Sequence, residues 1–177
     1  METPDVRYPV GKFKFPETVS PDDRRKFVGE IAEAPFRLRE AVKGLGEAEL
    51  DTPYRPGGWT VRQVVHHLPD SHLNSYIRFR WALTEEEPTI KAYYEDRWAE
   101  LPDARTAPVE VSLKLLESLH SRWVGLLRSL NDQDWERSFR HPELGLLRLE
   151  QNAALYAWHG RHHVAHIAGL RERMGWK

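Results

Sequence analysis

Four histidines lie within eight residues near the end of the chain, in the stretch WHGRHHVAHI (158–167). They are His159, His162, His163 and His166, nearly half of the nine histidines in the protein. Imidazole is a common ligand of transition metals and a general acid or base near neutral pH. Because the chain has no cysteine, a metal site would have to use histidine, carboxylate or water ligands. The four histidines are therefore a ligand set, a solvated polar face or part of the core.

Apolar residues recur at helical spacing near the end of the chain and predict a helix over 149–174. On a wheel of about 100° per residue, His163 falls inside the apolar arc and His159 lies beside it. His166 lies at the margin of the arc, and His162 is predicted to point away from the bundle interior. The i, i+4 spacing of His159 and His163 places two imidazoles close enough to bind one metal ion. Such a pair also arises by chance in a histidine-rich helix, and it needs a third ligand from another helix.

Four earlier histidines are candidates for that third ligand. His66, His67 and His72 lie on one predicted helix, and His120 lies on the apolar face of the next. A lone buried histidine is more often a hydrogen-bonded core residue than a ligand. His120 is therefore open to three interpretations: a ligand, a hydrogen-bonding partner of a ligand, or a plain core residue. On a straight wheel, His72 lies nearest to the apolar stripe of its helix.

His67 begins a polar stripe that continues through Ser71, Asn74 and Arg78. Such a stripe either lines the mouth of a polar site or faces solvent. Pro69 is predicted to kink this helix, and the kink shifts the phase of every residue after it. The wheel therefore does not choose the third ligand.

A scaffold of helices must position these side chains. Amphipathic spacing predicts an all-α protein, a four-helix bundle formed by a single domain over 1–177. Ser20 followed by Pro21 marks the start of the first helix, and Thr60 with Gln63 forms a capping box at the start of the second. The four predicted helices span about 20–43, 60–83, 108–130 and 149–174.

The segments between the helices carry their own signals. Prolines and a glycine predict an extended N-terminal arm over 1–19. Residues 84–107 form a long charged and aromatic loop between helices two and three, with one helical turn near its middle. Connections of this length are often functional, and Tyr93, Tyr94, Asp96 and Trp98 are candidates to close over a site. A short hairpin is predicted near 138–148.

The overall charge excludes several classes of partner. The chain carries 26 basic and 27 acidic side chains, a formal net charge of −1, so no strong field favours nucleic acid or an anionic membrane. No apolar run approaches the roughly 20 residues of a membrane-spanning helix. The first residues lack the cationic start and apolar block of a secretory signal. We expect a cytoplasmic protein with neither nucleic acid nor membrane as a partner.

The segment DTPYRPGGWTVRQVVHHLPDSHLNSYIRFR (51–80) resembles the YfiT-like family of metal-dependent hydrolases. This family is a branch of the DinB-like superfamily that includes the bacillithiol transferases. The chain departs from the family pattern at Pro69, where members usually have alanine. The resemblance extends along nearly the whole chain, through YPVGKF near the start, YYEDRWAEL (93–101), LHSRW (119–123), HPE (141–143), YAWHGRHHVAHI and RMGW.

The resemblance implies one divalent metal ion per subunit, held by three histidines of a four-helix bundle. The second histidine of VVHHL, His67, is the implied ligand from helix two, and this assignment rests on the resemblance alone. His159 and His163 are the implied ligands from the last helix, in agreement with the wheel. Three neutral imidazoles leave an open coordination position, as in catalytic sites. Zn²⁺ suits such a site best and Ni²⁺ also fits it.

The family implies a hydrolase that acts on a small-molecule substrate with metal-activated water. One alternative is a metal-dependent transferase that activates a low-molecular-weight thiol such as bacillithiol. Another is a metal-binding stress protein without turnover. The catalytic residues stay open beyond the metal, with His120, Asn74 and Arg78 as candidates for supporting roles. Related bundles are commonly dimers, so we expect a homodimer.

Overall fold

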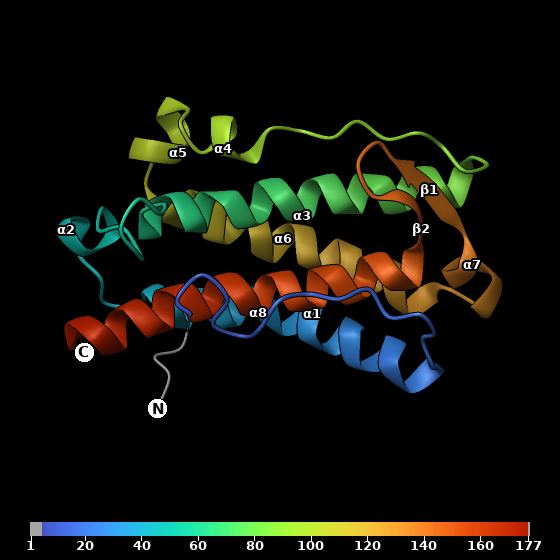
Figure 1. Cartoon of the computed structure of the whole chain (residues 1–177), viewed down its shortest axis with the longest axis horizontal. Coiled ribbons are helices and arrows are strands. Elements are labelled where there is room, and N and C mark those ends of the chain that lie inside the picture. The colour runs from blue at the N-terminus through green and yellow to red at the C-terminus, as the bar shows by residue number, and fades with distance from the viewer. Residues whose placement is uncertain (1–4, 177) are drawn as a thin grey trace.

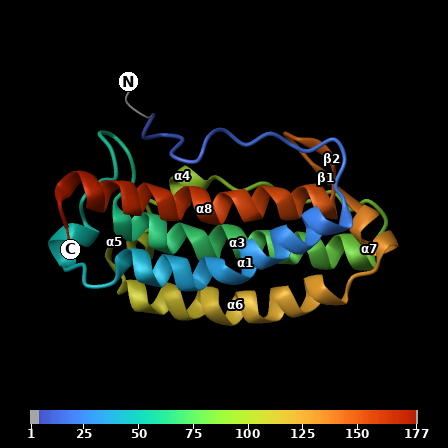
Figure 2. The same cartoon turned by 90° about the horizontal axis from the view of Figure 1, so that it is seen from below.

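The computed structural model of the chain describes residues 5–176, and four long helices run side by side in it (Figures 1 and 2). The predicted all-α four-helix bundle is thereby confirmed. Short helices and a two-stranded hairpin lie in the connections. The elements are α1 (Pro21–Val42), α2 (Glu47–Leu50), α3 (Val61–Thr84), α4 (Glu95–Trp98), α5 (Pro102–Thr106), α6 (Val109–Ser129), α7 (Asp132–Glu136), β1 (Ser138–His141), β2 (Gly145–Arg148) and α8 (Leu149–Met174).

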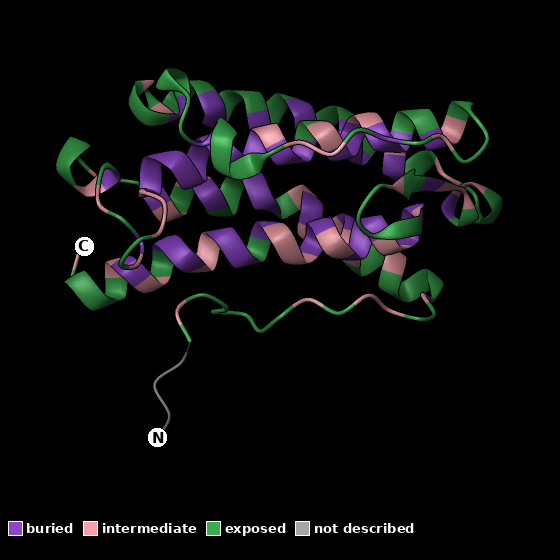
Figure 3. Cartoon of the chain, turned by 45° about the horizontal axis from the view of Figure 1, so that its top comes forward, coloured by how far each residue is buried: buried purple, intermediate pink, exposed green. Residues whose placement is uncertain are grey.

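The four long helices form a closed ring around the core. α1 packs against α8 and α6, and α3 packs against the same two helices from the other side. Their buried faces turn toward one another, as Figure 3 shows. Within the part of the chain that the structure describes, none of the helices is both long and apolar enough to cross a membrane.

Two predicted helix starts are confirmed by their capping bonds. Ser20 Oγ accepts a hydrogen bond from the Asp23 amide at 3.1 Å, and Thr60 Oγ1 accepts one from the Gln63 amide at 3.1 Å. Such caps satisfy amides that have no partner inside the helix. α1 and α3 then run through their internal prolines, Pro35 and Pro69. Each proline lacks an amide hydrogen, so the carbonyl four residues earlier loses its helical partner.

A layer of histidines divides the apolar core into two clusters along the bundle. One cluster surrounds Trp123 and Phe79 near the hairpin, and the other surrounds Leu68 and Ile167 at the opposite end. Fully buried histidines are unusual in apolar surroundings unless their nitrogens are hydrogen-bonded. The two that occupy the layer between the clusters are His72 and His120, which are 0% and 2% exposed.

Gly160 sets the close approach of α8 to α1. A Cβ atom added at Gly160 would lie 3.1 Å from the Cβ atom of Ala34. We therefore expect Gly160→Val to lower the free energy of unfolding by roughly 1–3 kcal/mol through overpacking. Gly125, in the interior of α6, has no atom within 4 Å of the same added position, so Gly125→Ala should instead raise it by up to about 1 kcal/mol. Urea unfolding of the two variants measures the expected decrease and the expected increase in the free energy of unfolding.

The N-terminal segment lies along the outer side of α8 in both views (Figures 1 and 2). Residues 5–20 contain no helix or strand, and the first four residues of the predicted arm lie outside the described part of the chain. Trp158 Nε1 donates a hydrogen bond to the Gly11 carbonyl at 3.1 Å, and Gln151 Nε2 donates one to the Pro16 carbonyl at 3.1 Å. The segment therefore covers the helix that carries four of the histidines.

The long loop between α3 and α6 passes along α3 (Figure 1). The predicted helical turn in this loop is confirmed as α4. A second short helix, α5, was not predicted, because a proline such as Pro102 usually indicates a break in a helix. Pro102 instead occupies the first helical position of α5, where its missing amide hydrogen has no cost. The predicted hairpin is confirmed as β1 and β2, which pair antiparallel.

Candidate metal centre

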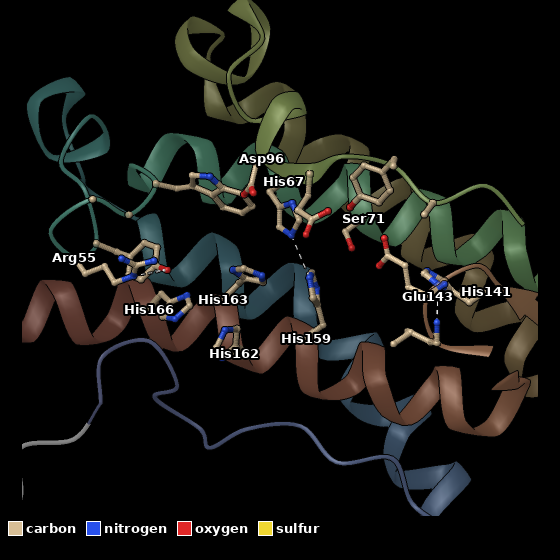
Figure 4. A pocket seen from close by; sticks show the side chains of 18 of the residues that line it. Arg55, His67, Ser71, Asp96, His141, Glu143, His159, His162, His163 and His166 are labelled. Atoms are coloured by element: carbon tan, nitrogen blue, oxygen red, sulfur yellow. Dashed lines mark hydrogen bonds between the residues drawn. The ribbon is translucent and has the colours of Figure 1, made fainter. Parts of the chain in front are cut away.

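Three histidines from two helices converge on one cavity, between Arg55 on one side and His141 on the other (Figure 4). His67 comes from α3, and His159 and His163 come from adjacent turns of α8. One ring nitrogen of each lies within 4.8 Å of the other two. The Nε2 atoms of His67 and His159 are 3.2 Å apart. This is the only group of three or more potential ligands of this kind among residues 5–176.

Burial keeps the three imidazoles neutral. Desolvation lowers the pKa of His67 to about 3, and it lowers the pKa values of His159 and His163 well below their ordinary range. A neutral imidazole offers the lone pair that a metal ion requires. The Nδ1 atom of His163 is buried without a hydrogen-bond partner in the described part of the chain. The donor set, three neutral nitrogens with their edges toward one cavity, fits a divalent transition metal.

A chain of hydrogen bonds leads from His159 into the core. His159 Nδ1 lies 3.1 Å from His72 Nε2, and His72 Nδ1 lies 2.8 Å from His120 Nε2. His120 Nδ1 in turn lies 2.6 Å from the Ile31 carbonyl oxygen of α1. That carbonyl has no helical partner because residue 35, four positions later, is proline. The series of hydrogen bonds thus ends on the Ile31 carbonyl oxygen, which Pro35 leaves without a helical partner.

The Ile31 carbonyl fixes the tautomers of the three hydrogen-bonded histidines, His120, His72 and His159. A carbonyl oxygen can only accept, so His120 carries its proton on Nδ1 and accepts at Nε2. His72 must then donate from Nδ1 and accept at Nε2, and His159 must donate from Nδ1. The lone pair of His159 therefore lies on Nε2, the atom that faces His67. His120, predicted as a possible supporting residue, contacts His159 only through His72.

The prediction that His162 points away from the interior is wrong. His162 is 8% exposed, lines the same cavity, and stacks on Trp158 with ring centroids 4.3 Å apart. The wheel considers only the bundle, whereas the N-terminal segment covers this side of α8. His166 is also buried, with Nε2 lying 3.2 Å from the Arg7 carbonyl oxygen of that segment. Desolvation lowers the pKa of both rings to about 4.

The polar stripe on α3 divides between the cavity and the helix surface. Ser71 and Arg78 line the cavity together with His67. Asn74 does not line it, and its Nδ2 atom donates to the Asp70 carbonyl of its own helix at 2.9 Å. His66 also points elsewhere, with Nδ1 lying 2.7 Å from Ser112 Oγ.

The cavity has a volume of about 500 Å³, within the range of sites for small molecules. Of the four loop residues predicted to close over a site, Tyr93 and Asp96 line it, and Tyr94 and Trp98 do not. Sequence reasoning missed Trp59, whose ring packs against His67 at a centroid distance of 4.7 Å. It also missed the hairpin residues His141 and Glu143, because periodicity does not show which end of the bundle a hairpin covers. Their signal lay in the matched segment HPE, which carried no assigned role.

Asp70, the residue after Pro69, makes stability depend on pH. Desolvation, with a smaller effect of the charge of Asp103 on α5, raises the pKa of Asp70 from 3.8 to about 6. The folded state therefore holds this proton more tightly than the unfolded state, and stability falls as the pH rises from about 4 to about 6.

Asp70→Asn has no buried carboxyl group to ionise at this position, so we expect it to be more stable than the wild type at pH 8. Its advantage over the wild type should grow by roughly 1 kcal/mol between pH 5 and pH 8, allowing for partial solvent access. Denaturant unfolding at both pH values measures this growth. Glu86→Gln, at an exposed position, serves as the matched control, and an equal pH dependence in the two variants would rule out the effect of Asp70.

The chain is similar to known proteins in both sequence and structure. Residues 30–167 match the family model described as the DinB superfamily. A protein of Bacillus mycoides (strain KBAB4), named "Putative metal-dependent hydrolase", is 56% identical over 172 residues, which cover 97% of this chain and 99% of that protein. A Bacillus cereus (strain 03BB102) protein of the same name matches with the same identity and coverage.

Among solved structures, YfiT from Bacillus subtilis matches with a TM-score of 0.95 and 50% sequence identity. The match covers 97% of this chain and 99% of that one. YfiT is described as "a probable metal-dependent hydrolase with an unusual four-helix bundle topology". Because the family model spans most of the chain and these relatives align over nearly its whole length, the chain belongs to the DinB superfamily, among its YfiT-like proteins.

Proposed function

We propose that this protein is a divalent-metal-dependent hydrolase of small molecules, with His67, His159 and His163 as the metal ligands. The observation that carries the proposal is the convergence of three neutral imidazoles on one cavity. The printed names of the relatives support the same reaction class. Zn²⁺ is our first choice of metal and Ni²⁺ the second, since both accept three nitrogen ligands.

An ion held there would supply Lewis acidity, which polarises a substrate carbonyl and makes water nucleophilic at neutral pH. The chain's own residues would do the rest. Trp59 packs against the rings of His67 and His163 and excludes water from that side. Burial raises the pKa of Tyr93, so its phenol keeps its proton at neutral pH and can donate a hydrogen bond to a substrate oxygen.

The experiment is hydrolysis of ester and amide panels by metal-loaded protein in the absence of any thiol. Release of product that requires both metal and His163 would support the hydrolase. A metal-dependent thiol transferase is the second candidate, because the chain has no cysteine and a thiol nucleophile would have to enter the cavity as cosubstrate. Turnover of an electrophile such as monochlorobimane only with bacillithiol would favour it. A fully loaded site that turns over neither panel would instead favour a metal-binding protein without catalysis.

The hydrogen bond from His72 to His159 predicts a measurable effect on metal affinity. We expect His72→Phe to weaken metal binding about 10- to 100-fold, because the Nδ1 proton of His159 then has no acceptor. At saturating metal the variant should still bind one ion per chain. Isothermal titration calorimetry with Zn²⁺ measures the affinity and the number of bound ions separately. Unchanged affinity in a folded variant would show that the hydrogen-bond chain does not orient His159.

A further inference from the structure

Arg78 is a buried cation without a hydrogen-bonding or ion-pair partner among the described residues. Only 6% of its surface is exposed, and it lines the cavity of the three histidines. Within residues 5–176, no carboxylate lies at salt-bridge distance from its guanidinium, and no described group accepts a hydrogen bond from it. Tyr93 and Tyr156 lie near it, but burial raises the pKa of each phenol and keeps it neutral. Arg78 therefore makes no ion pair with residues 5–176, although carboxylates such as Glu95 line the same cavity.

Arg62, on the same helix, shows how this protein treats a deeply buried arginine. Arg62 is 2% exposed, and its Nε donates to Asp51 Oδ1 at 2.6 Å. Its Nη1 donates to the Ala107 carbonyl at 3.1 Å, and it also pairs with Glu47. Taking an ion out of water costs several kcal/mol unless partners offset the loss. Arg78 lacks such partners, although its side chain borders a cavity that a ligand can enter.

We propose that Arg78 binds a carboxylate group of the substrate. A guanidinium pairs with a carboxylate through two parallel hydrogen bonds, and burial strengthens that pair. Phosphate offers similar geometry but carries more negative charge. Three further carboxylates, Glu95, Asp96 and Glu143, line the same cavity at exposed positions, and they would repel a dianion more strongly than a monoanion. The group bound by Arg78 is therefore better matched by one carboxylate than by a phosphate.

The helix fixes how far this carboxylate lies from the reacting group. Arg78 follows His67 by eleven positions, which places their Cα atoms about 16 Å apart along α3. Helical side chains tilt toward the N-terminus, so the guanidinium lies on the order of 10–15 Å from the three imidazoles. Ser71, between them, faces the same cavity. With the reacting end placed at the histidines, which rests on the proposed function, the substrate is an elongated molecule with a carboxylate remote from its scissile bond.

Binding of dicarboxylates tests the site without turnover. In zinc-loaded protein at constant ionic strength, sebacate is long enough to reach from the histidines to Arg78, whereas succinate is too short. We expect sebacate to raise the melting temperature more than succinate or uncharged 1,10-decanediol does. Arg78→Met should weaken sebacate binding about 10- to 100-fold, the loss of a bidentate charged pair, and leave succinate binding the same. Absence of the sebacate preference in the wild type would overturn the proposal even if Arg78→Met failed to fold.

Hydrolysis of a matched pair of esters separates this inference from the proposed function. We expect the wild type to prefer mono(4-nitrophenyl) sebacate over 4-nitrophenyl decanoate in kcat/KM, and Arg78→Met to bring the ratio close to one. If the variant keeps the preference while both esters are hydrolysed, the carboxylate site is wrong and the hydrolase stands. If neither ester is hydrolysed but sebacate binding depends on Arg78, the hydrolase is wrong and the carboxylate site stands.

Discussion

Replacing His163 with alanine is expected to abolish stoichiometric metal binding. Two imidazoles remain in this variant, so the ion loses one of three protein ligands. Loss of a hydrogen-bonding partner behind a ligand already costs about 10- to 100-fold in affinity, and loss of the ligand itself should cost more than about 100-fold. Elemental analysis after dialysis should fall from about one ion per chain to less than about one tenth, and metal-dependent hydrolysis should fall with it.

His141→Ala is the matched control for this prediction. His141 lines the same cavity but belongs to the hairpin and is not part of the three-histidine group. It should keep its metal content. The His163→Ala variant should also stay folded, because the substitution removes a buried nitrogen that has no partner in the described chain. A folded His163→Ala protein that retains one ion per chain would refute the assigned ligand set.

Chelation of the metal is expected to destabilise the whole bundle. The three ligands join α3 to α8, so an ion binds the folded state and has no preformed site in the unfolded chain. At free metal about a thousandfold above the dissociation constant, binding adds about 4 kcal/mol of stability. For a domain of this size, removal should lower the melting temperature by about 8–16 °C. Differential scanning calorimetry with and without a chelator measures the change.

The His163→Ala variant also serves as the reference for chelation. It should melt at the same temperature with and without the chelator, because it holds no ion to remove. A similar drop in both proteins would mean that the chelator acts elsewhere, and no drop in the wild type would mean that metal binding is not coupled to folding.

The sequence indicated the bundle because each long helix has a strong apolar stripe and a recognisable start. The capping residues Ser20 and Thr60 lie where their types and spacing predicted. The helical wheel also separated His163 and His159 from the rest of the tract, since the two share the inner side of α8. These results depend on local spacing, which a single helix fixes before any tertiary contact forms.

A helical wheel could not predict features that depend on contacts with other segments of the chain. His67 could not be chosen over its neighbours, because Pro69 made the phase of the helix ambiguous and only the family resemblance selected it. The burial of His162 was missed because a segment about 150 residues earlier in the chain covers it. The role of His72 was also missed. Its burial matched its apolar position, but its two hydrogen bonds, to α6 and α8, require the assembled bundle.

Pro35 has a consequence for attempts to engineer this protein. A proline in the interior of a helix is an obvious target for replacement, since alanine there gains about 3 kcal/mol in helix propensity. In this chain the replacement would introduce an amide that competes with His120 for the Ile31 carbonyl. In a variant stabilised in this way, the hydrogen bonds would no longer fix which nitrogen of His159 faces the cavity. Residue 35 would have this effect without a hydrogen bond to any of the three proposed ligands. Designers should treat residues 31, 35, 72 and 120 as one unit with His159.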